Sequence, residues 1–168
     1  NFTEKQAYMG ALELNHKIGK KFKYQLGATM LSGTAENSTV VGAFDPLYGT
    51  HHKFYGHIDY FYVGSPHGTG GLIDGYAGIG VAPAKKLKTN ITYHYFNSHI
   101  PVNGVSFLGH EIDFNLKYTI SKITSVQAGY SHFIQTTTIN DLKGVTAPNP
   151  YSGWGWIMLN IKPVFFKK

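Results

Sequence analysis

A run of alternating side chains at 108–120 is the clearest pattern in the chain. Its apolar positions include Ile112 and Phe114, and the polar positions between them include Glu111 and Asp113. Because successive side chains of a strand point to opposite faces, the run predicts a β-strand with one apolar and one polar face. The run is about twice the usual strand length of 5–6 residues. A membrane-spanning barrel strand of about 9–11 residues plus its rim fits that length better.

Six further segments show the same alternation. The predicted strands are 4–15, 21–32, 71–82, 87–97, 108–120, 124–135 and 153–166. Their connections alternate in length, with short turns at 16–20, 83–86 and 121–123 and long loops at 33–70, 98–107 and 136–152. Short turns on one side and long loops on the other are typical of outer-membrane barrels. We therefore expect 1–168 to be a single all-β unit, an antiparallel transmembrane β-barrel segment of about seven or eight strands.

The odd number of predicted strands matters, because single-chain bacterial barrels normally have an even number. An open sheet also leaves unpaired backbone groups at its edges, which lipid cannot satisfy. One solution makes 54–63 an eighth strand, but this would place a long loop on the short-turn side. We instead expect the C-terminal portion of a larger barrel, completed by another chain or segment. The sequence begins without a visible signal peptide, in agreement with a mature chain or a fragment.

Aromatic side chains are expected near both ends of the strands, where barrels carry interfacial girdles. The short-turn end would have Phe22, Tyr24, Tyr118 and Phe165, and the long-loop end Tyr93, Tyr95, Tyr130 and Trp154. Aromatic residues are common in strands of every kind. The girdle interpretation is favoured because both ends of the strands have them.

Composition and charge narrow the function classes. Only 14% of residues are charged, against about 25% in soluble proteins, and no apolar run is long enough for a transmembrane helix. The absence of cysteine excludes disulfide and thiol chemistry. All 15 basic residues are lysine and the formal net charge is +6, which suggests anionic partners without the bidentate recognition that arginine provides. The lysines are spread over alternate strand positions, which argues against nucleic acid as a partner.

Short motifs in the second half of the chain carry a family resemblance. They are Gly-His-Glu-Ile-Asp at 109–113, Gly-Tyr-Ser-His-Phe at 129–133 and an aromatic-rich closing strand that ends at Lys162 and Pro163. With the block 44–53, they resemble the C-terminal part of the alginate-export family, as in Bacteroidetes-type members. The resemblance covers most of 40–166. It implies a Gram-negative outer-membrane barrel of about 18 strands that passes anionic polysaccharide or other solutes. This chain differs from that family's pore in having no arginine.

The polar faces of the predicted strands would line a pore. The expected solute-contacting residues are Lys21, Lys23, Lys88, Asn90, His94, Glu111, Asp113, Asn115, Lys117, Asn160 and Lys162. Rings of like charge bias which ions enter a channel, so the lysines would favour anionic solutes or polysaccharide. An alternative is that the lysines pair with Glu111 and Asp113 and hold the strand register. The sequence leaves both interpretations open.

The long loop 33–70 contains clustered histidines and aromatic residues. His51, His52, His57, Asp59 and His67 are donor types that bind zinc or copper. Their spacing matches no familiar metal site, so we expect no metal and no other cofactor. The same loop carries the apolar residues Phe54, Tyr55, Ile58, Tyr60, Phe61 and Tyr62. Because their full exposure would be costly, we expect 53–63 to fold inward as a constriction or to form a short helix.

Catalysis is not expected. Glu111 and Asp113 share a face and are close enough to perturb each other, but Ser131 and His132 point to opposite faces of their strand, so no nucleophile–base pair forms. No Gly-x-Ser-x-Gly motif or phosphate loop is present. The sequence thus favours an outer-membrane porin with membrane lipid and anionic solutes as partners. The alternatives are a structural barrel subunit of a larger outer-membrane complex and a soluble lipocalin-like barrel, whose apolar face would point inward.

Overall fold

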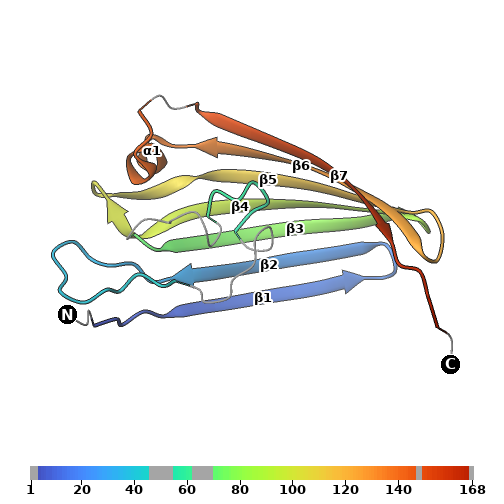
Figure 1. Ribbon diagram of the computed structural model, residues 1–168, viewed down its shortest axis with the longest axis horizontal. Helices are drawn as coiled ribbons and strands as arrows, with labels where there is room; N and C mark the ends of the chain where they lie inside the picture. The colour runs from blue at the N-terminus through green and yellow to red at the C-terminus, as the bar shows by residue number, and fades with distance from the viewer. Residues whose placement is uncertain (1–3, 46–54, 62–69, 147–148, 167–168) are drawn as a thin grey trace.

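The computed structural model describes residues 4–45, 55–61, 70–146 and 149–166. Within these ranges the elements are β1 (Met9–Ile18), β2 (Phe22–Leu31), β3 (Leu72–Ala84), β4 (Leu87–Val102), β5 (Val105–Thr119), β6 (Thr124–Gln135), α1 (Thr137–Lys143) and β7 (Tyr151–Ile161). The strands form one antiparallel sheet in chain order (Figure 1). In the described part of the chain, no helix is both long and apolar enough to cross a membrane.

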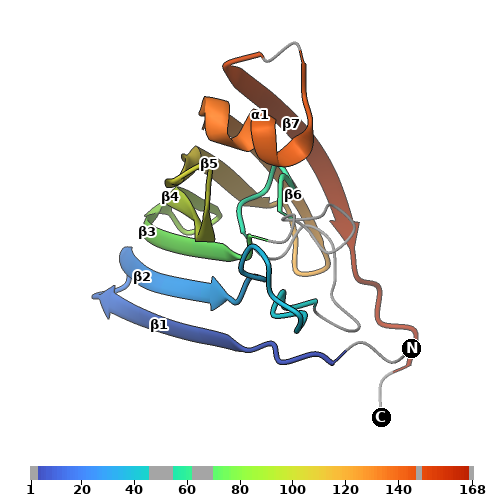
Figure 2. The same ribbon diagram turned by 90° about the vertical axis from the view of Figure 1, so that its left-hand side faces the viewer.

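The seven-stranded sheet is strongly curved but not closed. β1 pairs with β2 and β7 pairs with β6, and the two outer strands do not pair with each other. Figure 2 shows the strands following an arc, with the described residues 55–61 on its concave side. The predicted antiparallel all-β sheet is therefore confirmed, whereas closure into a barrel is not observed in this sheet.

The predicted loop at 98–107 is wrong. β4 runs to Val102 and β5 begins at Val105, so only Asn103 and Gly104 join them. Both residues have positive φ, 51° and 78°, as the type I′ hairpin turn requires. The alternation ends early because Asn97, Ser98 and His99 are all polar, and Pro101, a residue that normally marks the edge or end of a strand, follows them. The predicted loop at 136–152 likewise contains α1 and the first residues of β7.

The alternation of β5 shifts by one residue before Gly109. Phe96 of β4 pairs with Gly109, but Asn97 pairs with Phe107, so Leu108 is an extra residue on β5. Leu108 is fully buried in the core. The alternation over 108–120 predicts that Leu108, four residues before Ile112, lies on the same apolar face as Ile112. This prediction is wrong, because a one-residue bulge changes the face of the side chains beyond it.

The convex face of the sheet is apolar and exposed. On β5, Ile112 and Phe114 are 44% and 40% exposed, while Glu111 and Asp113 between them are 0% and 1% exposed. The same exposed face includes Leu12, Leu14, Leu26, Ile79, Ile91, Ile157 and Leu159. This arrangement is the reverse of a water-soluble sheet, which buries its apolar face and solvates its polar one.

Most of the predicted girdle residues lie on this convex face. Phe22, Tyr24, Tyr93, Tyr95, Tyr118 and Tyr130 are exposed. The outward prediction is wrong for Trp154, because it pairs in register with Ser131, which is buried on the concave side. Phe165 follows the end of β7 and is not part of the sheet.

A small hydrophobic core lies on the concave side, toward the long loops. It is formed by Leu31, Tyr55, Phe61, Leu72, Phe96, Leu108, Phe133 and Ile139. Phe61 packs on Phe96 with ring centres 4.7 Å apart, and Tyr60 stacks on Phe133 at 4.4 Å. The prediction of an inward fold is confirmed for 55–61, which forms no strand; we call these residues the inward segment. The remainder of the predicted segment, including Phe54 and Tyr62, lies outside the described residues.

Helix α1 contacts the inward segment in addition to the sheet. Lys143 in its last turn donates a hydrogen bond to the carbonyl oxygen of Tyr60. Its Nζ lies 5.2 Å from the centre of the Tyr60 ring and 5.7 Å from that of Phe61. Burial lowers the pKa of the Lys143 ammonium to about 8. These contacts connect α1 to the inward segment over the concave face.

Candidate functional site

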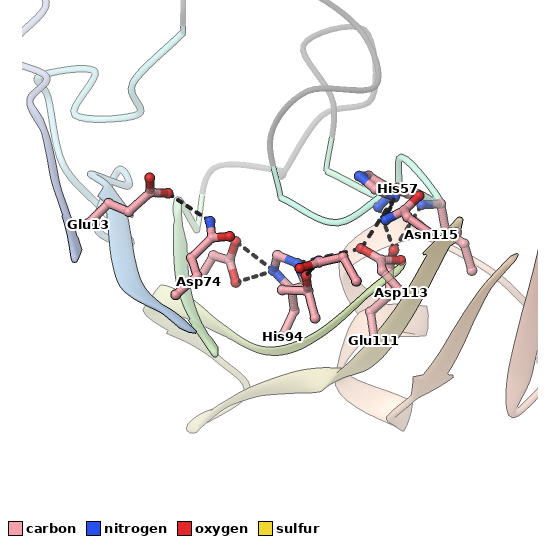
Figure 3. Close-up of polar contacts among 11 residues, drawn as sticks. Glu13, His57, Asp74, His94, Glu111, Asp113 and Asn115 are labelled. Carbon is pink, nitrogen blue, oxygen red and sulfur yellow. Dashed lines mark hydrogen bonds and ion pairs between the residues drawn. The ribbon is translucent and has the colours of Figure 1, made fainter. Parts of the chain in front are cut away.

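The strand register places polar side chains from several strands in rows across the concave face. Glu13 of β1, Tyr76 of β3, His94 of β4 and Glu111 of β5 lie in one row. The next row toward the short turns contains Gln25, Thr92 and Asp113. Figure 3 shows the charged members of these rows pointing into the concavity.

His94 bridges two buried carboxylates. Its Nδ1 lies 3.0 Å and 3.1 Å from the two oxygens of Asp74, and its Nε2 lies 3.5 Å from Oδ2 of Asp113 (Figure 3). Asp74 and Asp113 are only 2% and 1% exposed, so each needs a partner to compensate for lost hydration. A neutral imidazole has a single N–H and can donate to one of them, whereas an imidazolium ion can donate to both.

Glu111 holds the inward segment against the sheet. The backbone N–H groups of His57 and Ile58 donate to its Oε1, at 2.6 Å and 2.9 Å. The His57 ring then lies beside Asp113, with Nδ1 3.7 Å from Oδ2, and 3.4 Å from the amide nitrogen of Asn115. The inward segment, which is far from β5 in sequence, thus adds His57 to the polar cluster of Asp74, His94 and Asp113.

Glu13 forms the other end of this cluster. The hydroxyl of Tyr76 donates to its Oε2 at 2.8 Å and the amide of Gln25 at 2.9 Å, while the amide of Asn15 donates to Oε1. The Tyr76 ring reaches Glu13 by crossing Gly27, where an added Cβ would lie 2.4 Å from the ring. Gly27 is therefore required by this close approach.

These polar groups line a hollow of about 470 Å³ between the inward segment and the sheet. Its lining includes the acidic residues Glu13, Asp74 and Asp113, the histidines His57 and His94, and Tyr76. Tyr55 also lines it, and burial, followed by the charge of Asp74, raises the pKa of its phenol. We call this space the acidic hollow. It offers both hydrogen-bond donors and acceptors to a polar solute.

A second space, the lysine hollow, lies toward the short turns and has a volume of about 450 Å³. Lys17, Lys20, Lys21, Lys23 and Lys88 line it, and none of its described lining residues is a carboxylate. Asn90 lines both hollows, so the two are adjacent. Charges of opposite sign are therefore separated along the strand direction.

The predicted pore residues fall into three groups. His94, Asp113, Asn115 and Asn90 line the acidic hollow, next to the buried Glu111. Lys21, Lys23 and Lys88 line the lysine hollow, and Lys117, Asn160 and Lys162 line a smaller one of about 170 Å³. The prediction missed Lys17 and Lys20, because it ended the first strand before them, and it missed the contacts of His57. A longer first strand would have placed Lys17 on the face of Glu13.

The alternative of lysines paired with Glu111 and Asp113 does not fit the geometry. Among the described residues, Asp113 forms its ion pairs with His57 and His94. The residue opposite Lys88 is Lys117, and the residue opposite Lys17 is Lys23. Lysines therefore face lysines across neighbouring strands.

The histidine and carboxylate side chains considered as metal ligands are only partly within the described residues. Within the ranges given above, no group of three histidine, aspartate or glutamate side chains is placed to hold a metal ion. His51, His52 and His67 lie outside the described residues.

Ser131 is buried on the concave face, while His132 contacts the exposed Tyr130, with Nδ1 3.4 Å from its hydroxyl. The two neighbours thus point to opposite faces, as predicted.

Compared with known proteins, the chain matches no protein-family model and none of the curated proteins. The resemblance to the alginate-export family stays a prediction from short motifs.

Proposed function

We propose that the chain is part of an outer-membrane β-barrel through which anionic solutes, including acidic polysaccharide, cross the membrane of a Gram-negative cell by diffusion. The observation that carries the proposal is the inverted burial of the sheet. Ile157 and Leu12 are 82% and 68% exposed on the convex face, which lipid would stabilise and water would not. A lipocalin-like soluble barrel requires the opposite orientation.

The open edges of the sheet support the expectation of a partner that completes the barrel. β1 and β7 each have one neighbour, and unpaired backbone groups are costly in hydrocarbon. We therefore expect the intact detergent-solubilised particle to contain more protein than one 18.6 kDa chain. Native mass spectrometry measures this directly. A particle with a single copy and no other polypeptide would contradict the expectation.

The facing lysines support anionic solutes as the cargo. Like charges directly opposite each other in a sheet are destabilising. Lys17 faces Lys23, and Lys88 faces Lys117. In a pore for anions, this cost would have a function, because the positive charge of the lumen raises the local concentration of anions.

Ion selectivity tests this proposal. The variant Lys23→Gln/Lys88→Gln/Lys117→Gln should lower the ratio of chloride to potassium permeability, because it removes inward positive charge. The measurement is the reversal potential across a planar bilayer under a KCl gradient. The matched control, Lys85→Gln/Lys86→Gln/Lys122→Gln, removes the same charge from exposed residues of the short turns and should change the ratio less. Cation preference in the unmodified particle would contradict an anion pathway.

One observation favours a second candidate, a structural barrel subunit of a larger outer-membrane complex. The inward segment and the core around Phe61, Phe96 and Phe133 fill part of the concave face. A filled interior narrows any pathway. An intact particle that inserts into bilayers without conducting would support the structural role.

A further inference from the structure

The lysines of the short turns lie beyond the strand ends, whereas Lys17, Lys23, Lys88 and Lys117 are strand residues on the concave side. Two of the turn lysines, Lys20 and Lys122, also border the lysine hollow and the smaller hollow. Lys20 lies between β1 and β2, Lys85 and Lys86 between β3 and β4, and Lys122 between β5 and β6, and all four are exposed. The turns belong to neighbouring strand pairs at one end of the sheet (Figure 1). We call these four residues the turn-lysine surface.

No carboxylate neutralises this surface. All nine aspartate and glutamate residues of the sequence lie within the described ranges. Four are inside strands, namely Glu13, Asp74, Glu111 and Asp113, and the others, Glu4, Glu36, Asp45, Asp59 and Asp141, lie in segments outside the strands and the short turns. Lys86 donates to the backbone carbonyl of Ile120, at 3.1 Å, which leaves its charge in place. The positive charge therefore faces solvent or a partner.

The apolar convex face continues up to these lysines. Phe22 and Tyr118, next to the turns, are each 45% exposed, and Ile120 and Ile123 are 46% and 44% exposed. Membrane proteins commonly have apolar side chains in the hydrocarbon, and aromatic rings and lysines where the surface enters the lipid headgroups.

We propose that the turn-lysine surface binds the headgroups of anionic phospholipids in the leaflet around the short-turn end of the sheet. The proposal rests on the proposed function, since it needs the convex face in lipid. An ammonium group is a compact charge that contacts a phosphate at a single point, while its alkyl stem covers neighbouring apolar surface. A lipid fits better than a free anion because these lysines project from the turns beside Phe22 and Tyr118.

The test is a competition between two vesicle populations. The full chain, with any polypeptide that accompanies it, is offered phosphatidylcholine vesicles and vesicles that also contain phosphatidylglycerol, and the inserted protein is quantified after flotation. A lysine near an anionic surface contributes about a fivefold change in affinity. We expect at least about a tenfold preference for the anionic vesicles, strongly reduced in 1 M salt because the charges are screened.

Two variants that remove the same number of positive charges show whether the preference depends on the turn lysines or on net charge alone. Lys20→Gln/Lys85→Gln/Lys86→Gln/Lys122→Gln should lose the preference, whereas Lys17→Gln/Lys23→Gln/Lys88→Gln/Lys117→Gln, which changes strand residues on the concave side, should keep it. Equal insertion of the unmodified chain into both vesicles, or loss of the preference in both variants, would overturn the proposal while leaving the membrane barrel in place. Absence of insertion into either vesicle would overturn the proposed function as well.

Discussion

Gly56→Ala is expected to release the inward segment from the concave face. Gly56 has a φ of +80°, and a Cβ on it would lie 2.5 Å from Oε2 of Glu111. Glu111 is fully buried, so its carboxylate has no room to retreat. The clash would break the hydrogen bonds from the backbone N–H groups of His57 and Ile58 to Glu111. A hydrogen bond of this kind contributes about 0.5–1.5 kcal/mol to stability.

Limited proteolysis and conductance measure this release. Cleavage within the inward segment should become faster, and single-channel conductance should rise because the concave face is less filled. Gly104→Ala is the matched control: Gly104 has a φ of +78°, but nothing lies within 4 Å of an added Cβ. It carries the same backbone strain without the clash. Equal proteolysis of the two variants would show that Glu111 does not hold the segment.

The second large effect is expected on the convex face. Phe114→Lys places a charge in the middle of the apolar surface of β5, where Phe114 is 40% exposed. A lysine on the lipid face near the bilayer midplane costs about 2–4 kcal/mol in barrel stability. We therefore expect the free energy of unfolding in lipid vesicles to fall by about that amount.

The control for this variant adds a lysine to the other face. Gln25→Lys lies on the concave side, where the residue it replaces donates to Glu13. A lysine there keeps a partner and should change the free energy of unfolding by much less. Urea titrations of both variants refolded into vesicles give the comparison. A Phe114→Lys chain as stable as Gln25→Lys would place the convex face outside lipid.

Alternation predicted the sheet well where each strand is regular. The sixth predicted strand, 124–135, has the same bounds as β6. The prediction failed where the backbone departs from a simple period of two. β4 continues through the polar residues Asn97, Ser98 and His99, and the extra residue Leu108 shifts the alternation of β5 by one position. Neither a strand that continues through polar residues nor a one-residue bulge has a signature in the alternation itself.

The members of the candidate site were easier to predict than their contacts. A period of two was sufficient to place Glu111, Asp113 and Asn115 on one face of a strand. That His94 bridges Asp74 and Asp113 depends on the register of three strands. The hydrogen bond from His57 to Glu111 joins residues 54 positions apart. Periodicity is a local signal and carries no information about which loop returns to which strand.

The lengths of the strands suggest the depth of membrane that the sheet fits. β1 and β2 have 10 residues each, and at about 3.4 Å per residue each is roughly 34 Å long. Tilted by about 45°, such a strand crosses roughly 24 Å, close to the apolar band of about 25 Å in outer-membrane barrels. In the proposed membrane barrel, β4 and β5, with 16 and 15 residues, would be long enough to carry their shared hairpin above the bilayer surface.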